Sequence, residues 1–168
     1  EVSMGFQPEE QRNAYAAAQK IDIKQRANRA HKIVATAALS AAGTGAIPIP
    51  FSDAIAIVPI QITMLAAISY TFGLKTDKAL LSTLVSSTIT GTGASFAGRT
   101  IVANIAKFFP GLGSVAGAAI SGATAAAITT LFGEAYIKSL ELLFYRKTAD
   151  EIDMMDITEE LKKQLKIK

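Results

Sequence analysis

The chain has no cysteine, no tryptophan and a single histidine, and few of its residues carry a charge. The absence of cysteine excludes disulfides, thiolate zinc sites and cysteine nucleophiles. Charged residues make up 18% of the 168 residues, whereas soluble domains usually carry roughly a quarter. Only Asp77 supplies a carboxylate between residues 54 and 133, so paired acid–base chemistry and metal ligation lack the necessary groups there. We therefore expect a protein that is not an enzyme, with no catalytic, cofactor-binding or metal-binding residue.

Three stretches contain no charged side chain, namely residues 54–74, 79–98 and 108–133. An uncharged stretch of roughly 18 or more apolar residues is a candidate transmembrane helix. Alanine, glycine, serine and threonine dilute these stretches, however, and lower the free energy gained on transfer into lipid. The sequence thus leaves open spanning helices, peripheral membrane association and a soluble bundle.

Breaker residues divide the chain into four main helices, over 8–43, 52–73, 78–108 and 114–147. Glycine and proline separate them, because proline lacks a donor N–H group and glycine favours helix ends. The fold class we predict is all-α, with two Ala/Gly-rich helical hairpins that pair the first helix with the second and the third with the fourth.

Two short stretches carry additional secondary-structure signals, one within the third predicted helix and one near the C-terminus. Serine and threonine between residues 83 and 90 lower helix propensity, so a strand there stays open. The stretch from Asp156 to Glu159 resembles a capping box and predicts a short C-terminal helix with Leu161 and Leu165 on one face.

The turn between the first two predicted helices, together with the second helix, contains five residues of structural or functional interest. Two prolines in the turn end the first helix, and an aspartate caps the second. A third proline kinks the second helix and leaves one backbone carbonyl unpaired. A glutamine two residues later can bond that carbonyl or bridge to a neighbouring helix. A ligand or coupling role for the aspartate and glutamine is the alternative. These residues are Pro48, Pro50, Asp53, Pro59 and Gln61.

Small residues recur at helical spacing near the start of the fourth helix, and they predict a smooth strip for close helix packing. Such strips occur in membranes and also in close-packed soluble bundles. The residues concerned are Gly113, Gly117, Ser121 and Gly122.

A basic cluster precedes the first apolar stretch, with only Asp22 as an acidic residue among its members. No aromatic residue is interleaved with the cluster, so anionic lipid fits it better than nucleic acid, and a solvated helix face is the alternative. His31 lies in the same stretch and fits a solvated or interfacial position. The cluster consists of Lys20, Lys24, Arg26, Arg29 and Lys32.

Residues 93–100 match the phosphate-binding loop G-x-x-x-x-G-K-[ST] except that Arg99 replaces the lysine. Such a loop also needs a preceding strand and a downstream carboxylate for magnesium. No acidic residue lies between Asp77 and Glu134, so we interpret this stretch as a glycine-rich part of a helix.

Several short stretches together resemble one known family. They are Ala46–Asp53 (A-I-P-I-P-F-S-D), Val58–Met64, Tyr70–Gly73, Phe108–Gly113, Ile120–Ala125 and Gly133–Tyr136. They resemble the YcjF-like family, the GTPase-associated hydrophobic domain of unknown function 697, over about 30–147. The I-P-I-P-F-S-D stretch is the most specific of them.

The resemblance implies a domain organisation and a cellular setting. Members commonly follow a Ras-like GTPase domain, and several are predicted to lie in or on the bacterial inner membrane. This implies that residues 1–29 form an amphipathic junction from an upstream domain, 30–147 an apolar helical domain and 148–168 a charged tail.

The function expected on this basis is a non-catalytic helical domain that anchors a GTPase to the membrane, or couples the GTPase with it. The expected partners are membrane lipids, the upstream GTPase domain and a second copy of the chain, without nucleic acid. One alternative is a soluble interaction or dimerisation module in the cytoplasm, and another is a hydrophobic-hairpin pore former.

Overall fold

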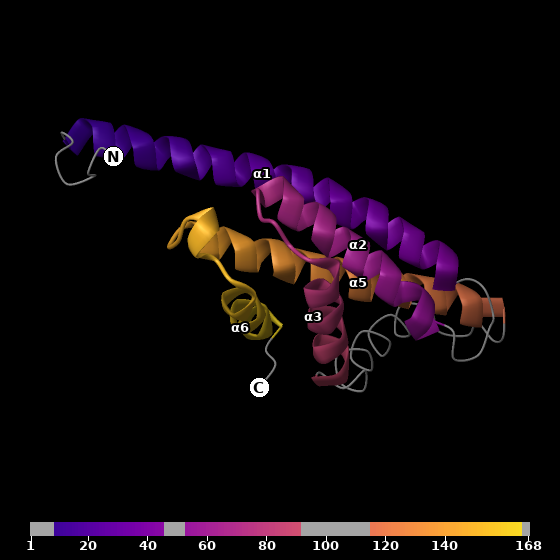
Figure 1. The fold of residues 1–168 in the computed structure, drawn as a ribbon. Coiled ribbons are helices and arrows are strands. Elements are labelled where there is room, and N and C mark those ends of the chain that lie inside the picture. The colour runs from indigo at the N-terminus through magenta and orange to yellow at the C-terminus, as the bar shows by residue number, and fades with distance from the viewer. Residues whose placement is uncertain (1–8, 46–52, 92–114, 166–168) are drawn as a thin grey trace.

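The computed structural model describes residues 9–45, 53–91 and 115–165, and the elements within these ranges are helices (Figure 1). They are α1 (Glu9–Gly45), α2 (Asp53–Phe72), α3 (Lys78–Gly91), α5 (Val115–Phe144), the 3-10 turn η2 (Ala149–Glu151) and α6 (Met154–Gln164). The described ranges contain no strand, which confirms the all-α fold class. Residues 83–90 belong to α3, so the strand alternative for this stretch is wrong.

Helix α2 ends where the sequence places its stop signal. Gly73 adopts a positive φ of 83°, a backbone conformation that glycine reaches without steric cost. The Gly73 amide donates to the carbonyl of Tyr70 at 3.0 Å, and the Leu74 amide donates to that of Ser69 at 2.9 Å. This pair of hydrogen bonds satisfies carbonyls that the helix end would otherwise leave unpaired.

Helix α1 is the central element, because it packs along both α5 and α2. A side chain added at Gly122 of α5 would meet Ala42 of α1, and one added at Gly133 would meet Val34. As the residue number rises on α5 it falls on α1, so the two helices are antiparallel. The buried side chains of α1 that face its neighbours are Ile23, Ala27, Ala30, Val34, Ala37, Ala38 and Ala41.

A buried hydrogen bond joins α2 to α5. The hydroxyls of Ser69 and Tyr136 lie 2.7 Å apart, and both side chains are fully buried. Burial raises the pKa of Tyr136 to about 12, against a smaller lowering by the bond to Ser69. The phenol therefore stays neutral and fixes the relative positions of the two helices, since breaking the bond would leave buried polar atoms unpaired.

The two helices predicted to form the second hairpin, α3 and α5, each pack mainly against another helix. Within the described residues α5 lies chiefly along α1, whereas α3 packs against α2 and makes a smaller contact with α6. The small residues of α5 explain this preference, because they let its backbone approach α1 closely. Residues 92–108 of the predicted third helix lie outside the described ranges.

The C-terminal helix starts earlier than the sequence suggested. Asp153 is the N-cap of α6, and its carboxylate accepts a hydrogen bond from the amide of Asp156 at 2.8 Å. Asp156 accepts in return from the amide of Asp153 at 3.2 Å. The capping box is thus formed by Asp153 and Asp156, and the expectation of a box from Asp156 to Glu159 was wrong by one turn. Leu161 and Leu165 do share the face that packs against the core.

Candidate functional site

The outer face of α1 exposes apolar side chains to solvent. Ile21 is 58% exposed, Leu39 is 76% exposed, and Ala35 is also exposed. At 100° per residue these three lie within about 40° of one another around the helix axis, and we call them the outer stripe. Asn28 is exposed on the same side between Ile21 and Ala35, so a polar group interrupts the stripe. The stripe lies opposite the side chains that α1 buries against α2 and α5, and no described helix covers it.

Four basic side chains surround the outer stripe, and all are exposed. At 3.6 residues per turn, Lys20 and Lys24 lie to one side of the stripe, and Arg29 and Lys32 lie to the other, with Lys32 next to its edge. Within the described part of the chain none of the four is in an ion pair. Their charges are therefore free to attract an anionic partner.

Arg26 differs from the other members of the basic cluster, because it contacts other groups of the protein. The side chain turns inward, where its guanidinium donates to the carbonyl of Phe72 at the end of α2. It also pairs with Asp22 at 2.8 Å and lies 5.9 Å from the ring centroid of Phe144. Arg26 thus satisfies an unpaired carbonyl at a helix C-terminus, where a positive charge is favoured.

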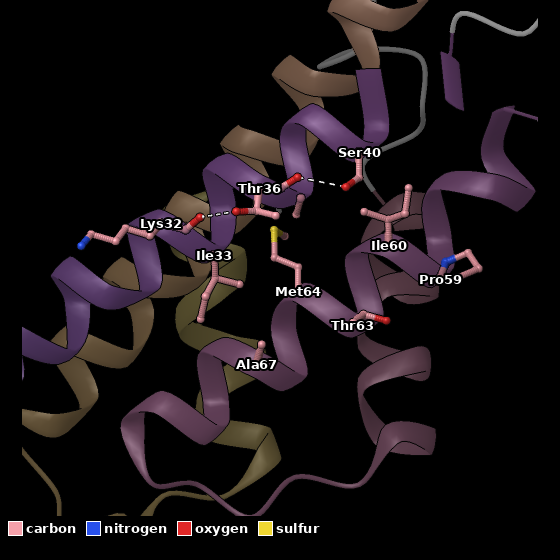
Figure 2. Close-up of a pocket in the computed structure, with 10 residues that line it drawn as sticks. Lys32, Ile33, Thr36, Ser40, Pro59, Ile60, Thr63, Met64 and Ala67 are labelled. Carbon is pink, nitrogen blue, oxygen red and sulfur yellow. Dashed lines mark hydrogen bonds between the residues drawn. The ribbon is translucent and has the colours of Figure 1, made fainter. Parts of the chain in front are cut away.

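A groove of about 540 Å³ runs between α1 and α2 beside the outer stripe (Figure 2). Buried Ala37 and Met64 form its floor, and the half-buried Ile33, Ile60 and Ala67 form its walls. The rim consists of Lys32, Thr36, Ser40, Pro59 and Thr63. The groove is therefore apolar inside, with hydroxyl groups and one ammonium group along its edge.

The structure distributes the other sequence-derived candidates over several places. Pro59 lies inside α2 and borders the groove. Gln61 is only 2% exposed, and its Oε1 atom has no hydrogen-bond partner within the described residues. Asp53 begins α2, but the structure does not describe its side chain. Pro48 and Pro50 lie outside the described residues altogether.

The small-residue strip of α5 is described only in part. Gly117 and Ser121 belong to α5, but the structure does not describe their surroundings. Gly113 lies outside the described residues. A Cβ atom added to Gly122 would lie 2.7 Å from the carbonyl oxygen of Ala42. Gly122 therefore marks a close approach of the α5 and α1 backbones.

Sequence reasoning missed Gly133 and the groove. A Cβ at Gly133 would lie 2.6 Å from a methyl group of Val34 and 3.0 Å from the sulfur of Met64. Gly133 follows Gly122 at helical spacing through Ala126 and Thr129, and this continuation of the strip was the available signal. The groove left no such signal, because it combines residues from two helices.

Polar contacts elsewhere on α1 join it to α5. His31 Nδ1 lies 3.0 Å from Glu134 Oε1, and both side chains are partly exposed. Glu134 therefore pairs with α1, and Lys138 of α5 lies 3.5 Å from Glu141 of the same helix. Among the described residues no group of three or more metal-ligating side chains comes together.

No helix in the described part of the chain is both long enough and apolar enough to cross a membrane.

Comparison with known proteins gives one curated relative and one family. The chain is 26% identical over 103 residues to magnetosome membrane protein 22 of Magnetospirillum gryphiswaldense. The match covers 61% of this chain and 53% of the relative, so it spans about half the relative's length. No solved structure matches. The family model described as domain of unknown function 697 matches residues 10–166, and this chain belongs to that family.

Proposed function

We propose that this chain is a non-catalytic helical domain that binds anionic membrane surfaces through the outer face of α1. The observation that carries the proposal is the exposed outer stripe with Lys20, Lys24, Arg29 and Lys32 around it. A helix with apolar side chains on its exposed face and basic residues around them is typical of binding in the plane of a membrane interface.

Charge and burial would act together at such an interface. Each lysine or arginine near an anionic leaflet contributes about 1 kcal/mol of attraction. The stems of these side chains are apolar and can lie against the acyl region while their charged ends remain in water. Because Asn28 interrupts the outer stripe, we expect charge to supply most of the attraction. The name of the curated relative, a membrane protein, supports the same setting.

Vesicle flotation tests the proposal. We expect the chain to float with vesicles that contain anionic phospholipid and not with neutral vesicles, and we expect binding to fall as salt rises. Reversing three charges (K24E/R29E/K32E) removes about 3 kcal/mol of attraction and adds repulsion, so the partition coefficient should fall by at least about a hundredfold.

A matched variant with three reversed charges away from α1, K75E/K78E/K162E, should float like the wild-type chain. If both variants lost vesicle binding equally, net charge alone would explain the loss, and this result would contradict the proposal. Failure of the wild-type chain to float, together with a stable dimer in sedimentation, would favour the soluble interaction module. Leakage of an entrapped dye would favour the pore former.

We further propose that the domain anchors a Ras-like GTPase domain to the cytoplasmic face of the bacterial inner membrane. The first part of α1 supports this, because it projects beyond the other helices (Figure 1), and its described side chains up to Ile21 are exposed. A projecting helix can hold a second domain clear of the helical bundle. The test is the reading frame around this sequence, which should encode a phosphate-binding loop before Glu1. A frame without one would contradict the link.

A further inference from the structure

We propose that the groove between α1 and α2 takes up one acyl chain of an anionic membrane lipid, with the lipid phosphate held at Lys32. This inference rests on the proposed function and adds a defined lipid site to it. The volume of about 540 Å³ lies within the range of small-molecule sites, roughly 300–1,000 Å³. The groove is open along one side, so a chain could enter from the membrane interface.

The hydrogen-bonding state of the rim favours a hydrocarbon occupant. The Thr36 hydroxyl donates to the carbonyl of Lys32, and the Ser40 hydroxyl donates to that of Thr36, each at 3.0 Å (Figure 2). Both donors are thus already used within α1. An extended peptide in the groove would leave its own N–H and C=O groups unpaired against apolar walls, which is costly. A hydrocarbon chain has no such groups to satisfy.

The length of the groove suits a single hydrocarbon chain. The groove runs from Lys32 to Ser40 on α1, a distance of about 12 Å at 1.5 Å per residue. One hydrocarbon chain can lie along this length against the apolar floor formed by Ala37 and Met64.

The charge at one end gives the occupant its direction. Lys32 lies at the end of the groove formed with Ala67, and its ammonium extends outward (Figure 2). Arg29 lies one turn earlier on α1 and is also exposed. The described residues that line the other end, Ser40 and Pro59, carry no charge. A phosphate is thus favoured at the Lys32 end, with its chain extending toward Pro59.

Calorimetric titration of the full chain with dodecyl phosphate, below the concentration at which it forms micelles, tests this site. We expect saturable binding of one molecule per chain. Shortening the probe to octyl phosphate should weaken binding by up to about fourfold for each methylene removed. Equal affinity for the two probes, or for inorganic phosphate alone, would overturn the site.

Two variants and one neutral probe locate the binding. T63W places a large side chain on the exposed rim and should weaken dodecyl phosphate binding at least tenfold, while T83W, at an exposed threonine of α3, should leave binding unchanged. K32A should weaken binding of dodecyl phosphate severalfold and leave that of the neutral dodecyl maltoside unchanged. Unaltered binding of dodecyl phosphate by T63W, or by K32A, would overturn the proposal.

The outcomes separate this site from the proposed function. Vesicle binding without dodecyl phosphate binding would overturn the lipid site and leave peripheral membrane association standing. Dodecyl phosphate binding without vesicle binding would support the site and contradict membrane association. A shift of the T63W variant from dimer to monomer in sedimentation, with unaltered dodecyl phosphate binding, would identify a second copy as the occupant and overturn the proposal.

Discussion

At the scale of single residues, two glycines of α5 set how closely it approaches α1. The space for a Cβ atom at Gly122 is taken by the backbone carbonyl of Ala42, which cannot rotate away. At Gly133 the obstacle is Val34, whose β-branched side chain is held in one rotamer within a helix. A methyl group at either position would therefore push the helices apart.

We predict that G122A and G133A each lower the free energy of unfolding by about 1–3 kcal/mol, because the added methyl group overpacks the interface. Gly43 in α1 is the control, since nothing lies within 4 Å of its added Cβ atom. G43A should stabilise the protein by up to about 1 kcal/mol through helix propensity. Urea denaturation followed by circular dichroism measures all three, and a G122A variant as stable as G43A would contradict the close approach.

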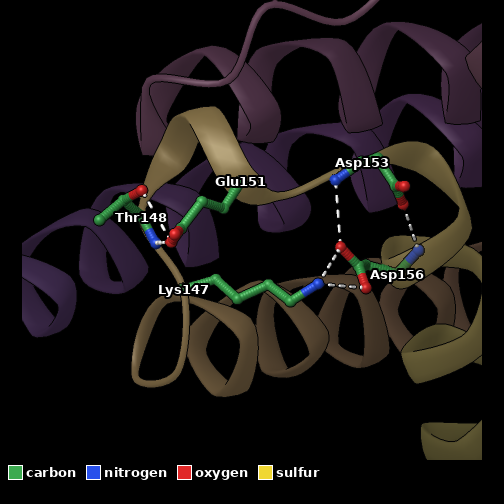
Figure 3. A network of polar contacts seen from close by, with 5 residues as sticks. All are labelled: Lys147, Thr148, Glu151, Asp153 and Asp156. Atoms are coloured by element: carbon green, nitrogen blue, oxygen red, sulfur yellow. Dashed lines mark hydrogen bonds and ion pairs between the residues drawn. The ribbon is translucent and has the colours of Figure 1, made fainter.

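At the scale of elements, the C-terminal segment is tied to α5 by one polar network (Figure 3). Lys147, just after α5, donates to both carboxylate oxygens of Asp156 at 2.7 Å. Asp156 also accepts from the amide of Asp153, and Glu151 accepts from the amide and hydroxyl of Thr148. The bond from Lys147 lowers the pKa of Asp156 below its usual 3.8, and the same bond raises the pKa of Lys147 above 10.5.

These shifts predict how stability depends on pH. A carboxylate with a lowered folded-state pKa contributes stability above its unfolded value, and this contribution is lost as the pH falls through the folded-state value. The wild-type chain should thus melt at a higher temperature than D156N at neutral pH, and the difference should shrink below about pH 3.8. Melting followed by circular dichroism from pH 2 to 7 measures it. D150N, at an exposed aspartate of η2, is the control, and a difference that is constant with pH would contradict the ion pair.

At the scale of the whole molecule, α1 serves two roles along its length. From Ile23 onward it buries a continuous face, whereas its described side chains before that residue are exposed. Among its described side chains, the first polar contact with α5 is the bond from the Gln19 amide to the carbonyl of Phe144 at 3.4 Å. The bundle therefore does not depend on the first two turns of the helix.

We predict that deletion of residues 1–16 leaves the melting temperature unchanged within about 2 °C, because the segment contributes no described core contact. Deletion of residues 1–26 removes buried Ile23 and the bond from Arg26 to Phe72. Loss of one large buried aliphatic side chain costs about 2–5 kcal/mol, so this variant should melt well below the wild-type chain. Equal melting temperatures of the two truncated chains would contradict the proposal that α1 contributes to the core only from Ile23 onward.

The sequence by itself determined that these segments are helical, and it determined where α2 ends. Gly73 ends α2 because only a residue free of a Cβ atom takes its positive φ at no steric cost, and Pro59 lies inside α2 as predicted. Such preferences act within one turn of chain, and so they can be read from neighbouring residues. The basic residues around the outer stripe were also visible, since helical spacing fixes which residues share a face.

Only the tertiary structure decided which helices pair and where the groove lies. Arg26 belongs to the basic cluster in sequence, but the end of α2 turns it inward. Met64 and Ala37 form one floor although they come from different helices. The preference of α5 for α1 depends on a close approach at Gly122 and Gly133 to residues about 80 to 100 positions away in the chain. The helix propensities of neighbouring residues do not predict such distant partners, because these contacts form only when the helices pack.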